Sequence, residues 1–238
     1  MRVVSAVFRR EIGSLFGHPP AYVALIVWVA LQSAFTLWLD DLLAAGVCTM
    51  DRPFWFMALG FVVVVPAIAM RMFAEERRTG SMELLGTLPA RPIELVVGKW
   101  LAATAVIAVA LSLTLPWPIA LALHGPLDPG PVIGGYLALL LFGAASTALG
   151  TLASAVADHP TVAFLGALTL CLTPWLLGLA LPMVPGALAP LVDHLSFQHH
   201  LAALTHGVLD TAALVHAGAT IAIGLSLSAA ALEARRLA

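Results

Sequence analysis

The stretch VIGGYLALLLFGAASTALGTLASAV, residues 132–156, decides the class of fold because it runs without a charged residue. A helix of roughly 20 apolar residues spans the ~30 Å hydrocarbon core of a bilayer. Similar runs, apolar and nearly free of charge, lie near 20–39, 54–72, 100–123, 161–182 and 211–232. We therefore predict an all-α fold, a polytopic membrane helical bundle of about six transmembrane helices, built as one transmembrane domain over residues 1–238.

Composition excludes a soluble globular protein. Of the 238 residues, 61% are apolar and 10% are charged, and the mean hydropathy is +1.00. Soluble domains carry about 25% charged residues, so this chain could not cover its surface with polar groups. The first 18 residues, MRVVSAVFRREIGSLFGH, lack the apolar core of a secretory signal peptide.

The basic residues predict the orientation. With both termini on one side of the membrane, Arg52 alone falls on the far side. Cytoplasmic loops are enriched in arginine and lysine, so we predict a multi-pass protein of the bacterial cytoplasmic (inner) membrane with both termini cytoplasmic. The cytoplasmic set is Arg2, Arg9, Arg10, Arg71, Arg77, Arg78, Arg91, Lys99, Arg235 and Arg236.

The N-terminal segment has helical apolar spacing. Its apolar residues recur every three or four positions, whereas Arg9, Arg10 and Glu11 lie largely elsewhere. We favour a short helix in the membrane interface, with its arginines toward lipid phosphates; the alternative is a flexible cytoplasmic tail. The apolar residues are Val3, Val4, Val7, Phe8, Ile12, Leu15 and Phe16.

The loop after the second run is the most informative part of the chain. It reads FAEERRTGSMELLGTLPARPIELVVGKW, residues 73–100. Gly80 should end a first helical piece, Ser81 can cap a second, and a further short amphipathic piece, Arg91 to Lys99, should lead into the third span. We expect a helix–turn–helix beneath the bilayer at residues 75–93, called the elbow below. It either receives a soluble partner or merely joins two spans.

The sequence contains no nucleotide-binding motif, and its spans lack the ionisable residues that ion-coupled carriers use. Gly98-Lys99 is followed by Trp100, and Ile93 stands where a phosphate-binding loop needs its first glycine. Ion-coupled carriers place ionisable groups in mid-membrane, whereas here only His216 comes near a span. We therefore expect no cofactor in this chain, and an energy source outside it.

Two other groups of residues have ordinary interpretations. No acidic or cysteine set completes a metal site with the outer histidines, so we read them as interfacial side chains. Cys48 and Cys171 show no metal-type spacing, and we expect no disulfide between them. The histidines are His194, His199, His200 and His206.

Small residues line the fourth apolar run, residues 132–156. They permit close approach of helices, and we favour packing inside one bundle over a seam between two copies. They are Gly134, Gly135, Gly143, Ala144, Ala145, Ser146 and Gly150.

Three segments resemble a known family. MRMFAEERRTGSMELLGTLPARPIELVVGKWLAA, residues 70–103, closely resembles the ABC-2 type permeases, and within them the gliding-motility-type permease subunit. HLSFQHHLAALTHGVLD, residues 194–210, is similar to that subgroup's segment before the last span, although Thr205-His206 replaces a small residue and an arginine. LEARR, residues 232–236, also fits.

The resemblance implies a six-span permease that pairs through its first and fifth spans. It also implies an interfacial N-terminal helix and short re-entrant helices at 182–210, where Pro182, Pro185 and Pro190 break the chain. A coupling helix in the elbow would contact a separate ABC ATP-binding subunit, which binds the ATP. We expect that contact at Glu75, Glu76, Arg77, Arg78, Gly80 and Glu83.

The resemblance also implies an exporter, which is not itself an enzyme. A second permease copy, or a related membrane subunit with a large external domain, would complete it. We expect membrane lipid and no nucleic acid among its partners. Two alternatives remain: a non-transporting membrane anchor that recruits an ATPase, and an intramembrane enzyme. The second is disfavoured because Glu75 and Glu76 adjoin arginines at the inner surface and do not lie within a span.

Overall fold

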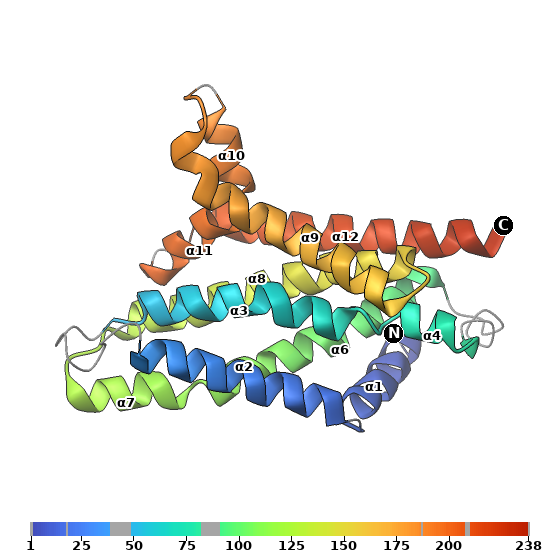
Figure 1. Ribbon diagram of the computed structural model, residues 1–238, viewed down its shortest axis with the longest axis horizontal. Coiled ribbons are helices and arrows are strands. Elements are labelled where there is room, and N and C mark those ends of the chain that lie inside the picture. The colour runs from blue at the N-terminus through green and yellow to red at the C-terminus, as the bar shows by residue number, and fades with distance from the viewer. Residues whose placement is uncertain are drawn as a thin grey trace.

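The computed structural model describes residues 2–17, 19–38, 49–81, 91–186, 188–207 and 210–237, and every regular element in these ranges is helical. The long helices run back and forth along one direction (Figure 1). The elements are α1 (Arg2–Gly17), α2 (Pro19–Trp38), α3 (Asp51–Ala69), α4 (Ala74–Arg78), α6 (Pro92–Leu113), α7 (Pro116–His124), α8 (Pro129–Val156), α9 (Pro160–Ala180), η1 (Leu181–Met183), α10 (Ala189–Leu195), α11 (Phe197–Thr205) and α12 (Thr211–Leu237).

The helices agree with the predicted all-α membrane bundle. Within the described ranges, five stretches are long and apolar enough to cross a membrane: Asp51–Arg78, Pro92–His124, Pro129–Val156, Pro160–Met183 and Thr211–Arg236. A sixth span is obtained if the bent pair Val3–Gly17 and Tyr22–Leu37, which meet at 70°, counts as one. The prediction of about six spans is confirmed.

One boundary prediction is wrong. The piece from Arg91 to Lys99 is not a separate amphipathic segment. It forms the first part of α6, which starts at Pro92 and continues into the third apolar run. Proline suits a first helical position because it has no N–H to leave unpaired, and the Glu94 carboxylate accepts a hydrogen bond from the Arg91 N–H at 3.2 Å. The helix then continues to Leu113, before the turn ahead of Pro116 and Pro118.

The N-terminal segment is helical, so the alternative interpretation as a flexible tail is wrong. Helix α1 packs against α6, where a Cβ added at Gly98 would lie 2.8 Å from the Val7 Cβ atom and 3.2 Å from the Val4 carbonyl oxygen. The side chains of Arg9 and Arg10 are exposed, whereas Val7 is half-buried. The apolar face of α1 therefore packs on protein as well as facing its surroundings.

Helix α8 packs against α3, α6, α9, α11 and α12. Its glycines make this possible: a Cβ at Gly135 would lie 2.0 Å from the Phe54 ring of α3, one at Gly143 would lie 2.6 Å from Ile107 of α6, and one at Gly150 would lie 2.5 Å from the Ala69 Cβ atom. Lipid tails are as apolar as leucine, so close packing of this kind holds membrane helices together. The predicted packing of these small residues inside one bundle is confirmed.

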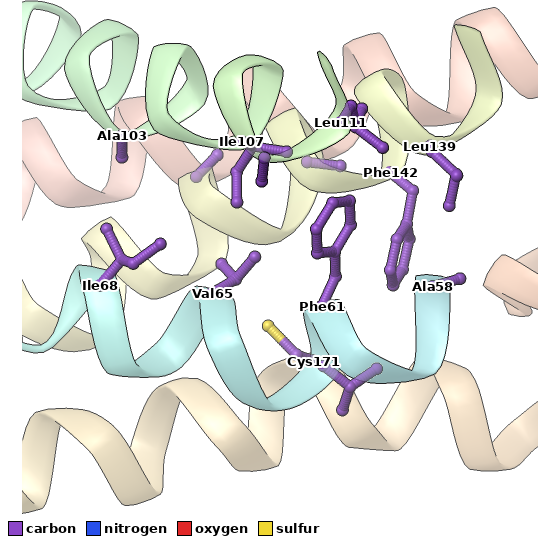
Figure 2. Close-up of a cluster of buried hydrophobic side chains, with 14 of the residues drawn as sticks. Ala58, Phe61, Val65, Ile68, Ala103, Ile107, Leu111, Leu139, Phe142 and Cys171 are labelled. Carbon is purple, nitrogen blue, oxygen red and sulfur yellow. The ribbon is translucent and has the colours of Figure 1, made fainter. Parts of the chain in front are cut away.

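The apolar core lies between α3, α6, α8 and α9 (Figure 2). Phe61 and Val65 of α3 point toward Ile107 of α6, with Phe142 of α8 beside them (Figure 2). Cys171 enters the same core from α9 as a buried free thiol. The other cysteine, Cys48, lies outside the described residues.

The bundle has two distinct ends (Figure 1). We call the end that holds α4, the N-terminus of α1 and the C-terminus of α12 the elbow end, and the end that holds α10 and α11 the histidine end. The prolines at 182, 185 and 190 break the chain after α9 into η1 and α10, as predicted. That these pieces re-enter the bilayer stays a prediction.

Candidate functional site at the elbow end

The described part of the elbow begins with helix α4. Glu75 and Glu76 occupy its first turn, and Arg77 and Arg78 its last. Acidic groups are favourable near the positive N-terminal end of a helix, and basic groups near its negative C-terminal end. Gly80 follows with φ of +74°, a left-handed conformation that favours glycine. The helix therefore ends at the position predicted from the sequence.

The N-terminus of α4 is capped by a side chain from another helix. The Ser154 hydroxyl of α8 accepts hydrogen bonds from the backbone N–H groups of Phe73 (3.0 Å) and Ala74 (3.2 Å). The first N–H groups of a helix have no partner within it, and a serine hydroxyl satisfies them. Ser154 is fully buried, so these hydrogen bonds hold the first residue of α4 against α8.

A group of charges with the buried Lys99 at its centre, here called the charge cluster, joins α1, α4 and α6. It consists of Arg10, Glu11, Glu76 and Lys99. The Lys99 side chain is 2% exposed, and its Nζ atom lies 2.8 Å from Glu11 Oε1 of α1 and 3.0 Å from Glu76 Oε1 of α4. It also donates a hydrogen bond to the Met72 carbonyl oxygen at 2.7 Å. A buried ammonium needs such partners, because its charge has lost the solvation of water.

Glu76 is the acidic centre of the charge cluster. Its side chain is 12% exposed and also lies 3.6 Å from Arg10 Nη2. The other carboxylate oxygen, Oε2, is buried and has no hydrogen-bond partner. The carboxylate therefore faces the inside of the protein and links α4 to α1 and α6.

Arg77 also turns inward, toward the turn between α8 and α9. Its guanidinium donates to the carbonyl oxygens of Ala155 (2.6 Å) and Ala157, and lies 3.5 Å from Asp158 Oδ1. Arg235 of α12 reaches the same turn, with Nη1 2.6 Å from Asp158 Oδ1. The hydrogen bond and the positive charge of Arg235 lower the pKa of the Asp158 carboxyl below its ordinary value. This turn thus connects α4 to the end of the last helix.

The remaining predicted contact residues face outward. Arg78 is 58% exposed and pairs with Glu75, 30% exposed, at 2.6 Å, and Gly80 is exposed. Glu83 lies outside the described residues. The structure therefore divides the predicted site in two: Glu76 and Arg77 hold the elbow to the bundle, whereas Arg78 and Gly80 are on its free face. The partly exposed Glu75 lies at the edge between that face and the cavity described next.

A cavity of about 470 Å³ lies beside the charge cluster. Both apolar and charged side chains line it, and α2 and α3 contribute only apolar ones. The apolar lining is Leu15, Ala24, Ala67, Ile68, Met70 and Met72, and the charged lining is Arg10, Glu11, Arg71, Glu75, Glu76 and Lys99.

At the histidine end, four histidines come together. The His200 ring lies 5.6 Å from that of His194, 5.2 Å from that of His199 and 4.4 Å from that of His216. His199 pairs with Asp193 at 3.0 Å. Among the described residues, no group of three or more histidine, cysteine, aspartate or glutamate side chains is placed to hold a metal ion. His206, exposed after α11, is not part of these ring contacts.

His200 is the buried member of this group. Its Nε2 atom lies 3.0 Å from the His194 carbonyl oxygen, and its Nδ1 atom is buried without a partner. Burial lowers the pKa of the His200 imidazole, because the low-dielectric surroundings disfavour its charged form. The surroundings therefore favour the neutral form of the ring.

Sequence reasoning missed Glu11, Lys99, Ser154 and Asp158 as parts of the elbow end. From the sequence, Lys99 is assigned only to the cytoplasmic basic set and to the end of the loop before the third span. The available signal was its position between Val96 and Ala102, a lone charge in an apolar run that calls for a buried partner. Nothing in the sequence names that partner, since Glu11 lies on a different helix.

Residues 4–235 match the profile of a known family, described as ABC-2 family transporter protein. The matched range includes the whole elbow and every member of the charge cluster. No match to the chain was found among curated proteins.

Proposed function

The chain belongs to the ABC-2 family of transporter proteins, and on that premise we propose that a separate ATP-binding subunit docks on the free face of its elbow and drives the bundle between two packings. Family membership makes the chain a multi-pass membrane permease subunit of an ABC transporter, which is a transport component and not a catalyst. The ATP would be bound and hydrolysed by the partner, so this chain needs no cofactor.

The single observation that carries the docking proposal is the division of α4 into two faces. Arg78 and Gly80 are on the free face, with Glu75 at its edge, whereas Glu76 and Arg77 contact α1, α6, the end of α8 and the α8–α9 turn. A partner pressing on the free face would move a helix already joined to four elements. Switching between alternative packings requires such a rigid connection. Glu83, outside the described residues, completes the proposed contact.

We also propose an orientation. The elbow end holds the N-terminus of α1 and the C-terminus of α12, together with basic residues of the predicted cytoplasmic set, among them Arg10, Arg77 and Arg235. The positive-inside rule therefore supports a cytoplasmic elbow end. ATP is cytoplasmic, so this orientation in the bacterial inner membrane also suits the docking proposal.

The finer proposals rest on the sequence resemblance. They are that the protein is an exporter of the gliding-motility type, and that a second copy or a related membrane subunit with a large external domain completes it. The apolar surface left on α2 and α9 suits such pairing: Ile26 and Val27 of α2 and Leu165 and Leu179 of α9 are exposed.

The test is copurification in mild detergent with the ATP-binding subunit encoded beside this chain, measuring ATPase activity with and without the chain. We expect a stable complex with altered ATPase activity. Arg78→Glu should weaken the complex by roughly tenfold if Arg78 forms one charge-assisted contact across the interface. Reversing Glu76 or Arg77 would be less informative, since both also hold the elbow in place.

The matched control is the double variant Glu75→Arg with Arg78→Glu. It restores an ion pair within α4 in reversed order, so α4 keeps its internal pair while its outward charges are inverted. If the complex stays weak in the double variant, the contact is with the partner. If the double variant binds as well as the natural chain, the docking site is elsewhere. A stable complex that transports nothing would favour the non-transporting anchor.

A further inference from the structure

The cavity beside the charge cluster lies where α1 bends into α2. The helices Val3–Gly17 and Tyr22–Leu37 meet at 70°, and the cavity is lined by Ser14 and Leu15 from the first and Ala24 from the second. Its remaining wall comes from the end of α3, the turn after it, the elbow and Lys99 of α6. A helix bent at this angle cannot lie along the spans at both ends. The cavity therefore sits where the spanning part of the bundle gives way to its charged end.

The cationic side chains around the cavity differ in how many ion-pair or hydrogen-bond partners they have. Lys99 is paired with two carboxylates, whereas Arg10 has one long contact, 3.6 Å from Glu76, and is 58% exposed. Arg71 is exposed and, within the described part of the chain, takes part in no hydrogen bond or ion pair. Two guanidinium groups on this cavity are therefore available to an anion. Guanidinium is the side-chain group best matched to phosphate, because it can donate two parallel hydrogen bonds.

Carboxylates next to these arginines limit which anion fits. Glu75 lines the same cavity, and Arg78 contacts one of its oxygens, Oε1. The lining balances three carboxylates against three cations, so a ligand without net charge fits it better than an anion; the charged residues are Glu11, Glu75, Glu76, Arg10, Arg71 and Lys99. A ligand that carries an ammonium group close to its phosphate could place the ammonium at Glu75. A primary ammonium has three N–H donors for a carboxylate, whereas a quaternary ammonium has none.

The apolar half of the wall indicates the rest of the ligand. Ala24 of α2 and Ala67 and Ile68 of α3 line the cavity from the spans, and Leu15 lines it from α1. A free phosphate ester would leave this surface without a partner, whereas an acyl chain would cover it. The volume is in the range of ligand pockets, which suits a headgroup and the first part of its chains.

We propose that this cavity binds the headgroup of an aminophospholipid, with its phosphate on Arg71 and Arg10, its primary ammonium at Glu75 and its acyl chains along α2 and α3. The lipid comes from the leaflet that borders the elbow end. It touches α1, α3 and α4 together, so its binding stabilises the arrangement of the elbow, as any ligand specific for the folded state does.

The experiment is a lipid titration of the delipidated, detergent-purified protein followed by native mass spectrometry. The probes are phosphatidylethanolamine, phosphatidylcholine and phosphatidylglycerol with identical acyl chains, and glycerophosphoethanolamine as the headgroup without chains. We expect phosphatidylethanolamine to bind roughly fivefold more tightly than the other two lipids, because only it offers the ammonium hydrogen bonds. The chainless headgroup should not saturate the site over the same range.

The test variant is Arg71→Gln, and its matched control is Arg9→Gln, an exposed arginine of α1 that does not line the cavity. Arg71→Gln should weaken phosphatidylethanolamine binding by roughly tenfold, the effect of losing a charged hydrogen-bond partner, and Arg9→Gln should leave it unchanged. Unchanged thermal unfolding of Arg71→Gln without lipid verifies that the variant is folded.

Three results would overturn the proposal. Equal affinity for the three lipids would remove the role of Glu75 and the ammonium. Equal effects of Arg71→Gln and Arg9→Gln would show non-specific attraction to the α1 surface. Tight binding of the chainless headgroup would assign the cavity to a soluble phosphate ester. The readout is lipid affinity alone, so each result stands whether or not the elbow also docks an ATPase.

Discussion

The elbow end and the histidine end both contain clusters of polar side chains. The two clusters differ in how far apart in the sequence their contacting residues lie. At the elbow end, Lys99 joins Glu11 and Glu76, and Asp158 joins Arg77 and Arg235. These partners come from α1, α4, α6, α12 and the α8–α9 turn. At the histidine end, the clustered rings belong to the short stretch 194–216.

The chemistry of the two ends differs in the same way. The elbow end buries formal charges, which are costly unless fully paired, so its helices are fixed to one another by strong and specific contacts. The histidine end instead relies on ring contacts and on partners close in sequence, such as Asp193 for His199 and the His194 carbonyl oxygen for His200. A force applied to α4 would therefore reach most of the bundle, whereas a change near His200 would stay local.

Removing Lys99 should have the largest effect and would test whether the charge cluster fixes the elbow end. Lys99→Met leaves the Glu11 and Glu76 carboxylates buried without their cation, which we expect to cost about 3–5 kcal/mol of stability. The measurement is the thermal unfolding midpoint in detergent. The matched variant, Lys99→Met with Glu11→Gln and Glu76→Gln, removes the charges together and should recover most of the loss. An unchanged midpoint for Lys99→Met alone would contradict the account.

The Ser154 cap should have a smaller effect, confined to α4. Ser154→Ala removes the acceptor for the Phe73 and Ala74 N–H groups, and loss of such a cap costs about 0.5–2 kcal/mol. Hydrogen exchange should quicken in residues 73–81 and stay unchanged in α11. The control is Ser226→Ala, an exposed serine of α12 that bonds only within its own helix. Equal exchange in both variants would mean that α4 does not depend on α8.

At the histidine end, stability should depend on pH near neutrality. Burial lowers the pKa of His200 below the ordinary value of about 6.5. As pH falls through that value, the unfolded chain takes up a proton that the folded chain resists, so stability falls. The unfolding midpoint of the natural protein should therefore drop between about pH 7 and pH 5, and that of His200→Gln should drop less. An identical pH response would remove His200 from this role.

Asp158 should give the smallest effect. Here the charged form of the side chain stabilises the fold, whereas at His200 the neutral form does. Arg235 lowers the pKa of this exposed carboxyl, so the stability it adds is present above its ordinary pKa of about 3.9 and is lost as pH falls through the folded value. Asp158→Asn should lower the midpoint slightly at pH 7, and the difference from the natural protein should vanish in stronger acid. A difference that persists there would mean that the side chain acts without its charge.

The sequence predicted the local features of the molecule but not the polar contacts between distant helices. The spans followed from apolar runs, and Gly80 as the end of α4 followed from the glycine itself, because both signals are local. The inward turn of Arg77 did not, since its partners at Ala155 and Ala157 lie about 80 positions away. Lys99 was misread as a loop residue for the same reason. Polar pairs between distant helices depend on packing, which no single stretch of sequence contains.

Site-specific photo-crosslinking at the two ends tests the central proposal most directly. A photoreactive residue is placed at Arg78, on the free face of the elbow, and in a second protein at Met183, which is 89% exposed at the histidine end. Each is irradiated in membranes that contain the ATP-binding subunit encoded beside this chain. We expect a crosslink to that subunit from position 78 and none from position 183. A crosslink from position 183 alone, or equal crosslinking from both positions, would contradict docking at the elbow.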